Sequence, residues 1–229
     1  MTDSEGFMGF WADIDRDYVL RYQEWHNCEH MPERVGIVGF CEGRRYRGEP
    51  PGPMFFMCYV TDGPEVLRSE AYLAALNRPT AWTREALTHF RNPTRSIFKR
   101  VREFRFVDVN APYRLLIRFD DPREALVIAD ALQRCVGATT ARDDAARATL
   151  YEIDLEASNI MTAERAIYAG GAGAQRYLLS VETGLRATAE VLESEVRCHV
   201  LGERSADVDA GVFWLEMKVP AVDIPGKSS

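Results

Sequence analysis

The sequence lacks paired cysteines. Its five cysteines are widely spaced, their number is odd, and none forms a CxxC pair. This pattern argues against a disulfide framework and suits the reducing interior of a cell. We therefore expect a cytoplasmic protein. Cys41 and Cys58 are only weak candidates for a nucleophile, because free cysteines in strands are usually buried and inert.

Long apolar runs are also missing. No stretch approaches the roughly 18 uninterrupted apolar residues of a membrane-spanning helix. The first ten residues, MTDSEGFMGF, are acidic and lack the positive region and apolar run of a signal peptide. The sequence thus predicts neither a membrane segment nor a membrane partner.

A surplus of positive charge is absent too. The formal net charge is −7 at pH 7, whereas phosphate binding requires a concentrated excess of Lys and Arg. The longest basic cluster, residues 99–105, interleaves its charges with Val101, Glu103 and Phe104, as a strand with one wet face does. Nucleic acid is not an expected partner.

A phosphate-binding glycine loop is missing as well. The glycines of AGGAGA, residues 169–174, do not follow a strand and open a helix as such a loop must. We read them as an ordinary loop and expect no cofactor.

What is present is an ordinary globular composition, with 46% hydrophobic and 28% charged residues. A chain of 229 residues suits one large domain or two domains of about 110 residues. The hydrophobic pattern favours two similar halves, because the same order of elements occurs twice. The first set is strand 7–13, helix 15–31, strand 40–47, strand 54–61, helix 64–90 and strand 95–107. The second is strand 113–119, helix 122–135, strand 147–154, strand 176–182, helix 185–197 and strand 211–219.

Each set is the β-α-β-β-α-β order of a ferredoxin-like unit. We expect the halves to be residues 1–109 and 110–229, with Ala- and Gly-rich loops at 137–146 and 155–174. Strand 54–61 is apolar at nearly every position, so both of its faces need cover. The expected fold is therefore α+β: tandem ferredoxin-like repeats that form an α+β barrel within one chain, with a small-molecule pocket enclosed between their sheets.

The first helix has predicted ends. Asp15 or Asp17 can cap its N-terminus. Pro32 does not fit a helix interior, so the helix should end or kink near Met31.

This helix carries a polar arc. His26, Glu29, His30 and Glu33 fall within about 100° of one another and continue the core-facing stripe. They form either a structural ion-pair network or an acid/base pair with pKa values near working pH. Residues 26–30 also spell H-x-x-E-H, an inverted zinc-protease motif, but a further acidic ligand is lacking and no metal site is expected.

The next strand carries two adjacent arginines. Alternation places Arg44 and Arg45 on opposite faces, with Phe40, Glu42 and Tyr46 on the face of Arg44. Only one arginine can face the pocket, where it would bind a substrate carboxylate or serve as a counter-ion to a glutamate of the helix. Tyr46 is a candidate to donate a proton or position an enolate oxygen.

Three further side chains are candidates for substrate binding. Trp82 could cap a pocket, Thr80 lies beside it in sequence, and Trp11 lies on the first strand.

The segments YQEWHNCEHMPERVGIVGFCEGRRYRG (22–48) and SEAYLAALNRPTAWTR (69–84) resemble the EthD-like group of the dimeric α+β barrel superfamily. Its pattern is typically a W-x-x-x-E-H-x-x-E-R helix, a G-F-x-x-x-R-R-Y strand and an N-P-T-x-W-T element. The match covers roughly residues 5–107, and Arg78 between Asn and Pro is a departure. The resemblance places the motif's residues at His30, Glu29, Glu33, Arg44, Arg45 and Tyr46.

The resemblance implies a pocket between sheet and helices. It also implies a superfamily of cofactor-free isomerases, polyketide cyclases and enzymes that handle lactones or esters, with haem-degrading monooxygenases sharing the architecture. The second half resembles a degenerate copy without the His-bearing helix, so no catalytic residue is expected there.

We therefore expect a cofactor-free acid/base enzyme. His30 would shuttle a proton on a small unsaturated or aromatic carboxylate, Glu29 would orient it, and His26 and Tyr46 would assist. Isomerisation of an aromatic ring-cleavage product is preferred, followed by cyclisation or ester or lactone hydrolysis. The rivals are a non-catalytic binder of small aromatic acids and a haem-binding, monooxygenase-like protein. A homodimer is an open option.

Overall fold

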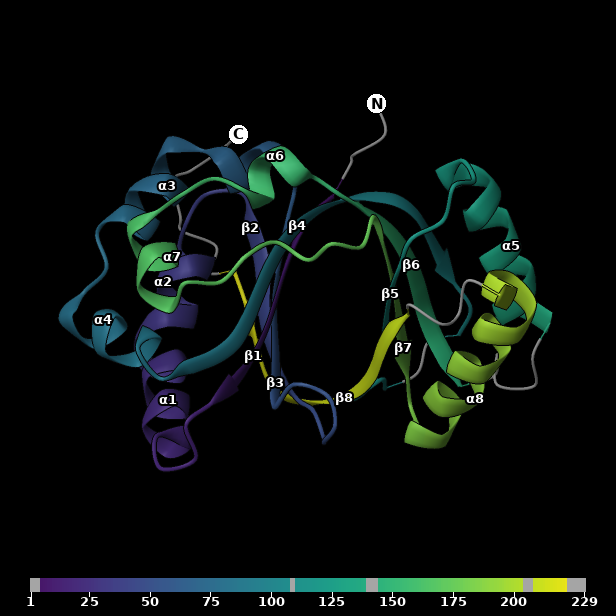
Figure 1. Ribbon diagram of the computed structural model, residues 1–229, viewed down its shortest axis with the longest axis horizontal. Coiled ribbons are helices and arrows are strands. Elements are labelled where there is room, and N and C mark those ends of the chain that lie inside the picture. The colour runs from purple at the N-terminus through teal and green to yellow at the C-terminus, as the bar shows by residue number, and fades with distance from the viewer. Residues whose placement is uncertain (1–4, 108–109, 139–143, 204–207, 222–229) are drawn as a thin grey trace.

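Antiparallel strands from both halves of the sequence join edge to edge in the computed structural model, which describes residues 5–107, 110–138, 144–203 and 208–221. They close a barrel in the order β1-β3-β2-β8-β5-β7-β6-β4 (Figure 1). The strands are β1 Gly6–Ile14, β2 Phe40–Arg47, β3 Phe55–Thr61, β4 Phe90–Arg105, β5 Tyr113–Phe119, β6 Ala145–Ile153, β7 Tyr177–Thr183 and β8 Asp209–Pro220.

The barrel is two copies of one sheet. The strands of the first half follow the order β4-β1-β3-β2, and those of the second half follow the equivalent order β8-β5-β7-β6. The copies join where β2 pairs with β8 and β4 pairs with β6. This confirms the predicted tandem ferredoxin-like α+β barrel. We propose residues 1–109 and 110–229 as the two units; Asp108 and Val109, at that boundary, lie outside the described residues.

Helices cover two opposite sides of the barrel. In Figure 1, α1 to α4 and α7 lie on one side, and α5 and α8 lie on the other. Among the described residues, no helix combines the length and the apolar character needed to cross a membrane. The helices are α1 Val19–Trp25, the π-helix η1 His26–His30, α2 Met31–Val35, the 3₁₀-helix η2 Pro64–Arg68, α3 Glu70–Asn77, α4 Ala81–Leu87, α5 Ala125–Ala138, α6 Leu155–Ser158, α7 Ala163–Tyr168, α8 Arg186–Val196 and the π-helix η4 Arg197–Leu201.

The middle of the barrel is a packed core rather than a chamber. Side chains alternate between the faces of each strand, so one set from every sheet points inward. The expected substrate pocket between the two sheets is therefore filled in its middle. The buried inward residues are Phe7, Trp11, Tyr46, Phe56, Cys58, Phe98, Leu116, Tyr151, Leu178 and Phe213.

The His-bearing helix was predicted to end or kink near Met31, and one helical element gives way to another at that point. The π-helix η1 ends at His30, and α2 begins at Met31 with Pro32 in its first turn, where a missing N–H is tolerated. The expected aspartate cap is wrong. Tyr18 is the N-cap of α1 without a side-chain bond, and Asp15 instead pairs with His89 and Arg91.

The segment 155–174, expected to be a loop, contains α6 and α7. Asp154 and Thr162 cap these helices by accepting bonds from the backbone N–H of Ala157 and Arg165. The segment leaves the second half and places α7 against α3 and α4 of the first half (Figure 1). Of the other expected loop, 137–146, residues 139–143 lie outside the described residues, while 137–138 belong to α5 and 145–146 to β6. The second half thus contributes α7 to the layer of helices that covers the sheet of the first half.

Candidate active site between sheet and helices

A cavity of about 40 Å³ lies between the outer face of the first sheet and the helices that cover it. We call it the helix-side cavity. Met8, Phe10 and other apolar side chains form much of its wall, so polar groups there are shielded from water. Its charged or titratable lining consists of His26, His30, Arg34, Tyr59, Tyr72, Arg95, Glu164 and Tyr168.

His26 is fully buried in this lining. Its Nδ1 lies 3.3 Å from a guanidinium nitrogen of Arg45. Because arginine only donates, Nδ1 must accept, and the proton of the neutral ring is therefore on Nε2. Nε2 is buried and has no hydrogen-bond partner within the described residues. His26 thus presents an unused N–H donor.

His30 lies on the same side of η1. Its ring packs 4.5 Å from that of Trp25 and 5.6 Å from that of His26, centroid to centroid. Its Nδ1 is also buried with no partner among the described residues. Burial, Arg34 and His26 hold the pKa of His30 well below its usual value, and burial, Arg45 and Arg34 do the same to the pKa of His26. Both rings are therefore neutral near pH 7, and His30 can accept a proton.

Arg95 brings to the cavity a positive charge that has no ion-pair partner among the described residues. It lies on β4, its side chain is buried, and Nη2 donates to the hydroxyl of Tyr72 at 3.0 Å. The carboxylate of Glu164 favours the charged form of Arg95 but forms its ion pair with Arg34 instead. By contrast, Arg34 is paired with Glu164 at 2.5 Å and with Glu33 at 3.2 Å. A buried charge without a counter-ion costs several kcal/mol, so the lining favours an anionic ligand.

Glu164 comes from α7, in the half where no catalytic residue was expected. Burial raises the pKa of its carboxyl, and the Arg34 guanidinium opposes that shift. The pair fastens α7 over the cavity. It also leaves the lining with two guanidiniums and one buried carboxylate.

Glu29 and Thr80 do not belong to the cavity lining. The Glu29 carboxylate accepts hydrogen bonds from the hydroxyls of Thr80 at 2.6 Å and Thr83 at 3.0 Å. Thr83 also accepts a bond from the indole of Trp25 at 3.1 Å. These contacts tie η1 to α4. Glu29 therefore has a structural role in this geometry, rather than the expected role of orienting an imidazole.

The two arginines of β2 face opposite sides, as alternation predicted. Arg45 faces the helices, where it contacts His26 and pairs with Glu216 at 2.9 Å. Arg44 and Tyr46 point into the barrel, so they lie across the sheet from His30 and do not share its cavity. Phe40 does not follow Arg44 as expected, because a bulge between residues 40 and 42 shifts the register and returns Phe40 to the helix side.

The two tryptophan candidates also lie outside the helix-side cavity. Trp11 is in the barrel interior, packed 4.9 Å from Phe56 and covered by the Arg118 guanidinium at 4.4 Å. Trp82 is partly buried on α4, with the Arg21 guanidinium 4.5 Å above its ring. Neither lines the space beside His30.

The remaining sequence candidates have no catalytic geometry in the described residues. No three side chains of His, Cys, Asp or Glu lie close enough there to hold a metal ion. Burial raises the pKa of Cys58 to about 11, and burial with nearby carboxylates raises that of Cys41. Neither thiol is an activated nucleophile.

Three residues of the cavity lining, Arg95, Tyr59 and Glu164, were not predicted from the sequence. Arg95 has the same strand face as the buried Ile97, and an arginine in phase with core residues was the available signal. Glu164 sat in a segment judged to be a loop, although a threonine cap two residues earlier marked a helix start.

Known proteins with similar structures identify the fold of this chain but not its activity. No family profile and no curated protein sequence matches the chain. A candidate monooxygenase from Fusobacterium nucleatum subsp. nucleatum is 8% identical, with 96% of each chain covered and a TM-score of 0.61. An anthrone oxidase-like protein is 8% identical, covering 96% of this chain and 94% of its own, with a TM-score of 0.59. A heme-binding protein from Thermus thermophilus is 8% identical, covering 93% and 91%, with a TM-score of 0.54.

At these identities the likeness establishes the ferredoxin-like α+β barrel alone. No comparison supports the EthD-like group specifically.

Haem does not fit the histidines of this chain. Ligands of drug size occupy pockets of about 300–1,000 Å³. His26 and His30 line a cavity of about 40 Å³, while His89 stacks on Tyr18 and His199 is exposed beside Glu195. Two larger pockets, one lined by Arg44 and Glu182 and the other by Arg47 and Trp214 among others, have no histidine in their lining.

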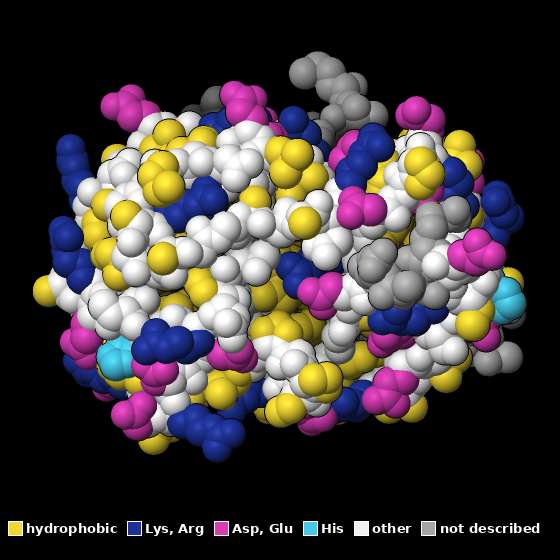
Figure 2. Space-filling model, in the orientation of Figure 1, with side chains coloured by type: hydrophobic (Ala, Val, Ile, Leu, Met, Phe, Trp, Pro, Cys, Tyr) yellow, Lys and Arg dark blue, Asp and Glu magenta, His cyan; other side chains and the backbone are white. Residues whose placement is uncertain are grey.

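The face shown in Figure 2 carries basic and acidic side chains interspersed rather than gathered by sign. A nucleic acid backbone is tracked by a continuous basic surface. The described side chains on this face form no such surface.

Proposed function

We propose that this protein is a cofactor-free acid/base enzyme that acts on a small unsaturated carboxylic acid bound in the helix-side cavity. The proposal rests on one observation. Arg95, which is buried and has no ion-pair partner among the described residues, lines the same cavity as the neutral imidazoles of His26 and His30. Nε2 of His26 and Nδ1 of His30 have no hydrogen-bond partner among the described residues. Buried polar atoms without partners are rare in folded proteins, and a ligand is one reason to retain them.

The binding roles follow from donor chemistry. Arg95 would hold the substrate carboxylate through its guanidinium fork, a pairing that supplies both charge and orientation. The Nε2–H of His26 would donate to an oxygen of the same group. Because the substrate carries negative charge, its arrival would also raise the pKa of His30 toward the working range.

The chemistry is a proton transfer. Nδ1 of His30 would remove a proton from the carbon between the carboxylate and the double bond. The electron pair left on that carbon spreads over the double bond and the carboxylate, where Arg95 and His26 stabilise the added charge. The His30 imidazolium then returns its proton at the far end of the former double bond. The product is an isomer, and the reaction requires no external oxidant or reductant.

Cavity size limits what can enter. A volume of about 40 Å³ gives room for about three water molecules. It therefore suits the acid end of a ligand, and a longer acid requires α7 to shift, since Thr162, Glu164 and Tyr168 form one wall. An aromatic ring-cleavage product is the preferred substrate of this kind.

Deuterium incorporation tests the proposal. Unsaturated acids, beginning with but-3-enoate, are incubated with the protein in D₂O and followed by proton NMR. The wild type should exchange the hydrogens next to the carboxylate, and His30→Gln should lose at least about 100-fold of that rate, the low end of general-base contributions. His89→Gln, a matched change at a partly exposed histidine paired with Asp15, should exchange like the wild type.

Binding of an acid without exchange would instead support the non-catalytic binder. A second candidate, oxygenation of a small aromatic compound without a cofactor, is favoured by the names of two structural neighbours. Substrate-dependent oxygen uptake would reveal it. A homodimer and a cytoplasmic location remain predictions, to be tested by light scattering and cell fractionation.

A further inference from the structure

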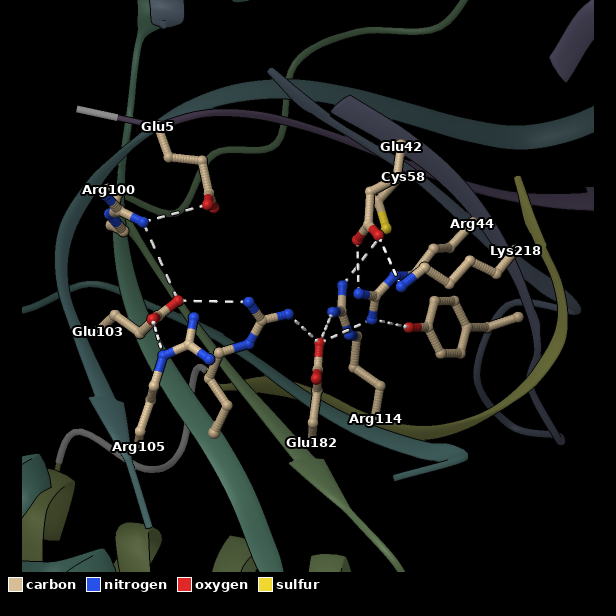
Figure 3. Close-up of polar contacts among 12 residues, drawn as sticks. Glu5, Glu42, Arg44, Cys58, Arg100, Glu103, Arg105, Arg114, Glu182 and Lys218 are labelled. Atoms are coloured by element: carbon tan, nitrogen blue, oxygen red, sulfur yellow. Dashed lines mark hydrogen bonds and ion pairs between the residues drawn. The ribbon is translucent and has the colours of Figure 1, made fainter. Parts of the chain in front are cut away.

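A second polar cluster occupies one end of the barrel interior, across the sheet from the helix-side cavity. Figure 3 shows guanidinium, ammonium and carboxylate groups from β2, β4, β5, β7 and β8 converging there. A pocket of about 640 Å³ opens at this end, lined in part by Arg44, Arg105, Arg147, Glu182 and Lys218. We call it the barrel-mouth pocket.

One carboxylate lies at the centre of the cluster. Oε1 of Glu182 accepts from Arg44 at 2.8 Å, from Arg147 at 2.7 Å and from Arg114. Burial alone would raise the pKa of this carboxyl, but Arg114, Arg44 and Arg147 hold it well below its usual range. Glu182 is therefore a fixed negative charge that gathers three guanidiniums.

The outer part of the cluster has two more carboxylates. Glu42 pairs with Arg44 at 2.5 Å and with Lys218 at 2.9 Å. Glu103 pairs with Arg105 at 2.8 Å and with Arg147 at 3.3 Å.

The charges do not balance. Arg44, Arg105, Arg114, Arg147 and Lys218 supply five positive charges, whereas Glu42, Glu103 and Glu182 supply three negative ones, which leaves a surplus of two. The Arg100–Glu5 pair beside them adds no net charge.

Two buried donors in the cluster are also unused. Nε of Arg44 and Nε of Arg114 have no hydrogen-bond partner within the described residues. The whole chain has a net charge of −7, so the positive charge of the barrel-mouth pocket is not explained by a general excess of basic residues.

We propose that the barrel-mouth pocket binds a small dianion, a phosphate group or a dicarboxylate, through Arg147, Arg105 and Lys218. Two negative charges would neutralise the surplus, and guanidinium forks match the paired oxygens of either group. The volume falls in the range of small-molecule sites. The site is separate from the helix-side cavity because the two open on opposite faces of the first sheet.

Inorganic phosphate and malonate are the probes, titrated by calorimetry at pH 7.5 against sodium chloride at equal ionic strength. At least one dianion should bind the wild type, and Arg147→Gln and Lys218→Gln should each raise its Kd about 10-fold or more, as expected for losing a charge-assisted hydrogen bond. Phosphate alone would identify a phosphate-group site, and malonate alone a dicarboxylate site. Arg147 and Lys218 are partly exposed, so these variants should fold.

Two controls locate the binding. Arg176→Gln removes one equally charged, ion-paired arginine that directly precedes β7, at the end of that strand opposite to Glu182, and should leave the Kd unchanged. Arg95→Met should also leave it unchanged, which separates this site from the proposed active site. The inference is overturned if neither dianion binds more tightly than chloride, if Arg147→Gln binds like the wild type, or if Arg95→Met abolishes binding.

Discussion

Acidification should destabilise this protein through its buried histidines, and His26 makes the effect measurable. Its side chain is fully buried, and burial with two nearby arginines lowers its pKa in the folded state. In the unfolded chain the same imidazole titrates near 6.5. Below that pH the unfolded state therefore binds a proton that the folded state does not. The stabilising contribution is complete above pH 6.5 and is lost as the pH falls.

The magnitude follows from linkage. Between pH 7.5 and 5.0, protonation of one imidazole in the unfolded state alone removes up to about 2 kcal/mol from the free energy of unfolding. His26→Gln keeps an acceptor for Arg45 but removes the titration. Urea unfolding at both pH values should therefore show a fall about 2 kcal/mol smaller in the variant than in the wild type.

A matched change at an exposed position is the control. His199→Gln should retain the full pH dependence of the wild type, because that side chain is 67% exposed. Equal pH dependence in the wild type and His26→Gln would refute a neutral, buried His26, and with it the donor role assigned to Nε2.

Two stability predictions concern the packing around the cavity. Glu164→Ala should lower the free energy of unfolding by about 3 kcal/mol, because it leaves the buried Arg34 with only the Glu33 pair. The control Glu33→Ala should lower it by about 1 kcal/mol or less. Equal losses for the two variants in urea unfolding would show that Glu164 is not buried against Arg34. Gly43→Ala should lower the free energy of unfolding by about 1–3 kcal/mol, because a Cβ at this position would lie 2.2 Å from Sδ of Met31. An unchanged melting temperature would contradict this close packing of α2 on β2.

The barrel was predicted from the β-α-β-β-α-β order that occurs twice, and from the apolar strand 54–61, both of whose faces need cover. Strand 113–119 was placed to the residue, whereas the predicted helix 64–90 is interrupted, with Pro79 in the gap between α3 and α4. Sequence patterns did not predict two local irregularities of the backbone. The bulge after Phe40 shifts the register of β2, and the helical spacing did not predict the π-helix η1 that precedes Pro32.

The candidate site could be predicted only in part. His26 and His30 were found because they continue an apolar helix face. Arg95 and Glu164, which line the same cavity, come from β4 and α7, and residues so far apart in sequence cannot be brought together by spacing rules. The role of Glu29 was misassigned for the same reason, since its threonine partners lie 51 and 54 residues away.

The central claim is that Arg95 is retained to bind a carboxylate, and Arg95→Met tests it most directly. The Kd of the tightest-binding acid of the unsaturated-acid panel is measured for both proteins, together with the free energy of unfolding. We predict a Kd at least about 10-fold higher in the variant, with stability unchanged or increased, because a buried unpaired charge has been removed. A Kd that changes less than threefold would contradict the claim, as would a large loss of stability.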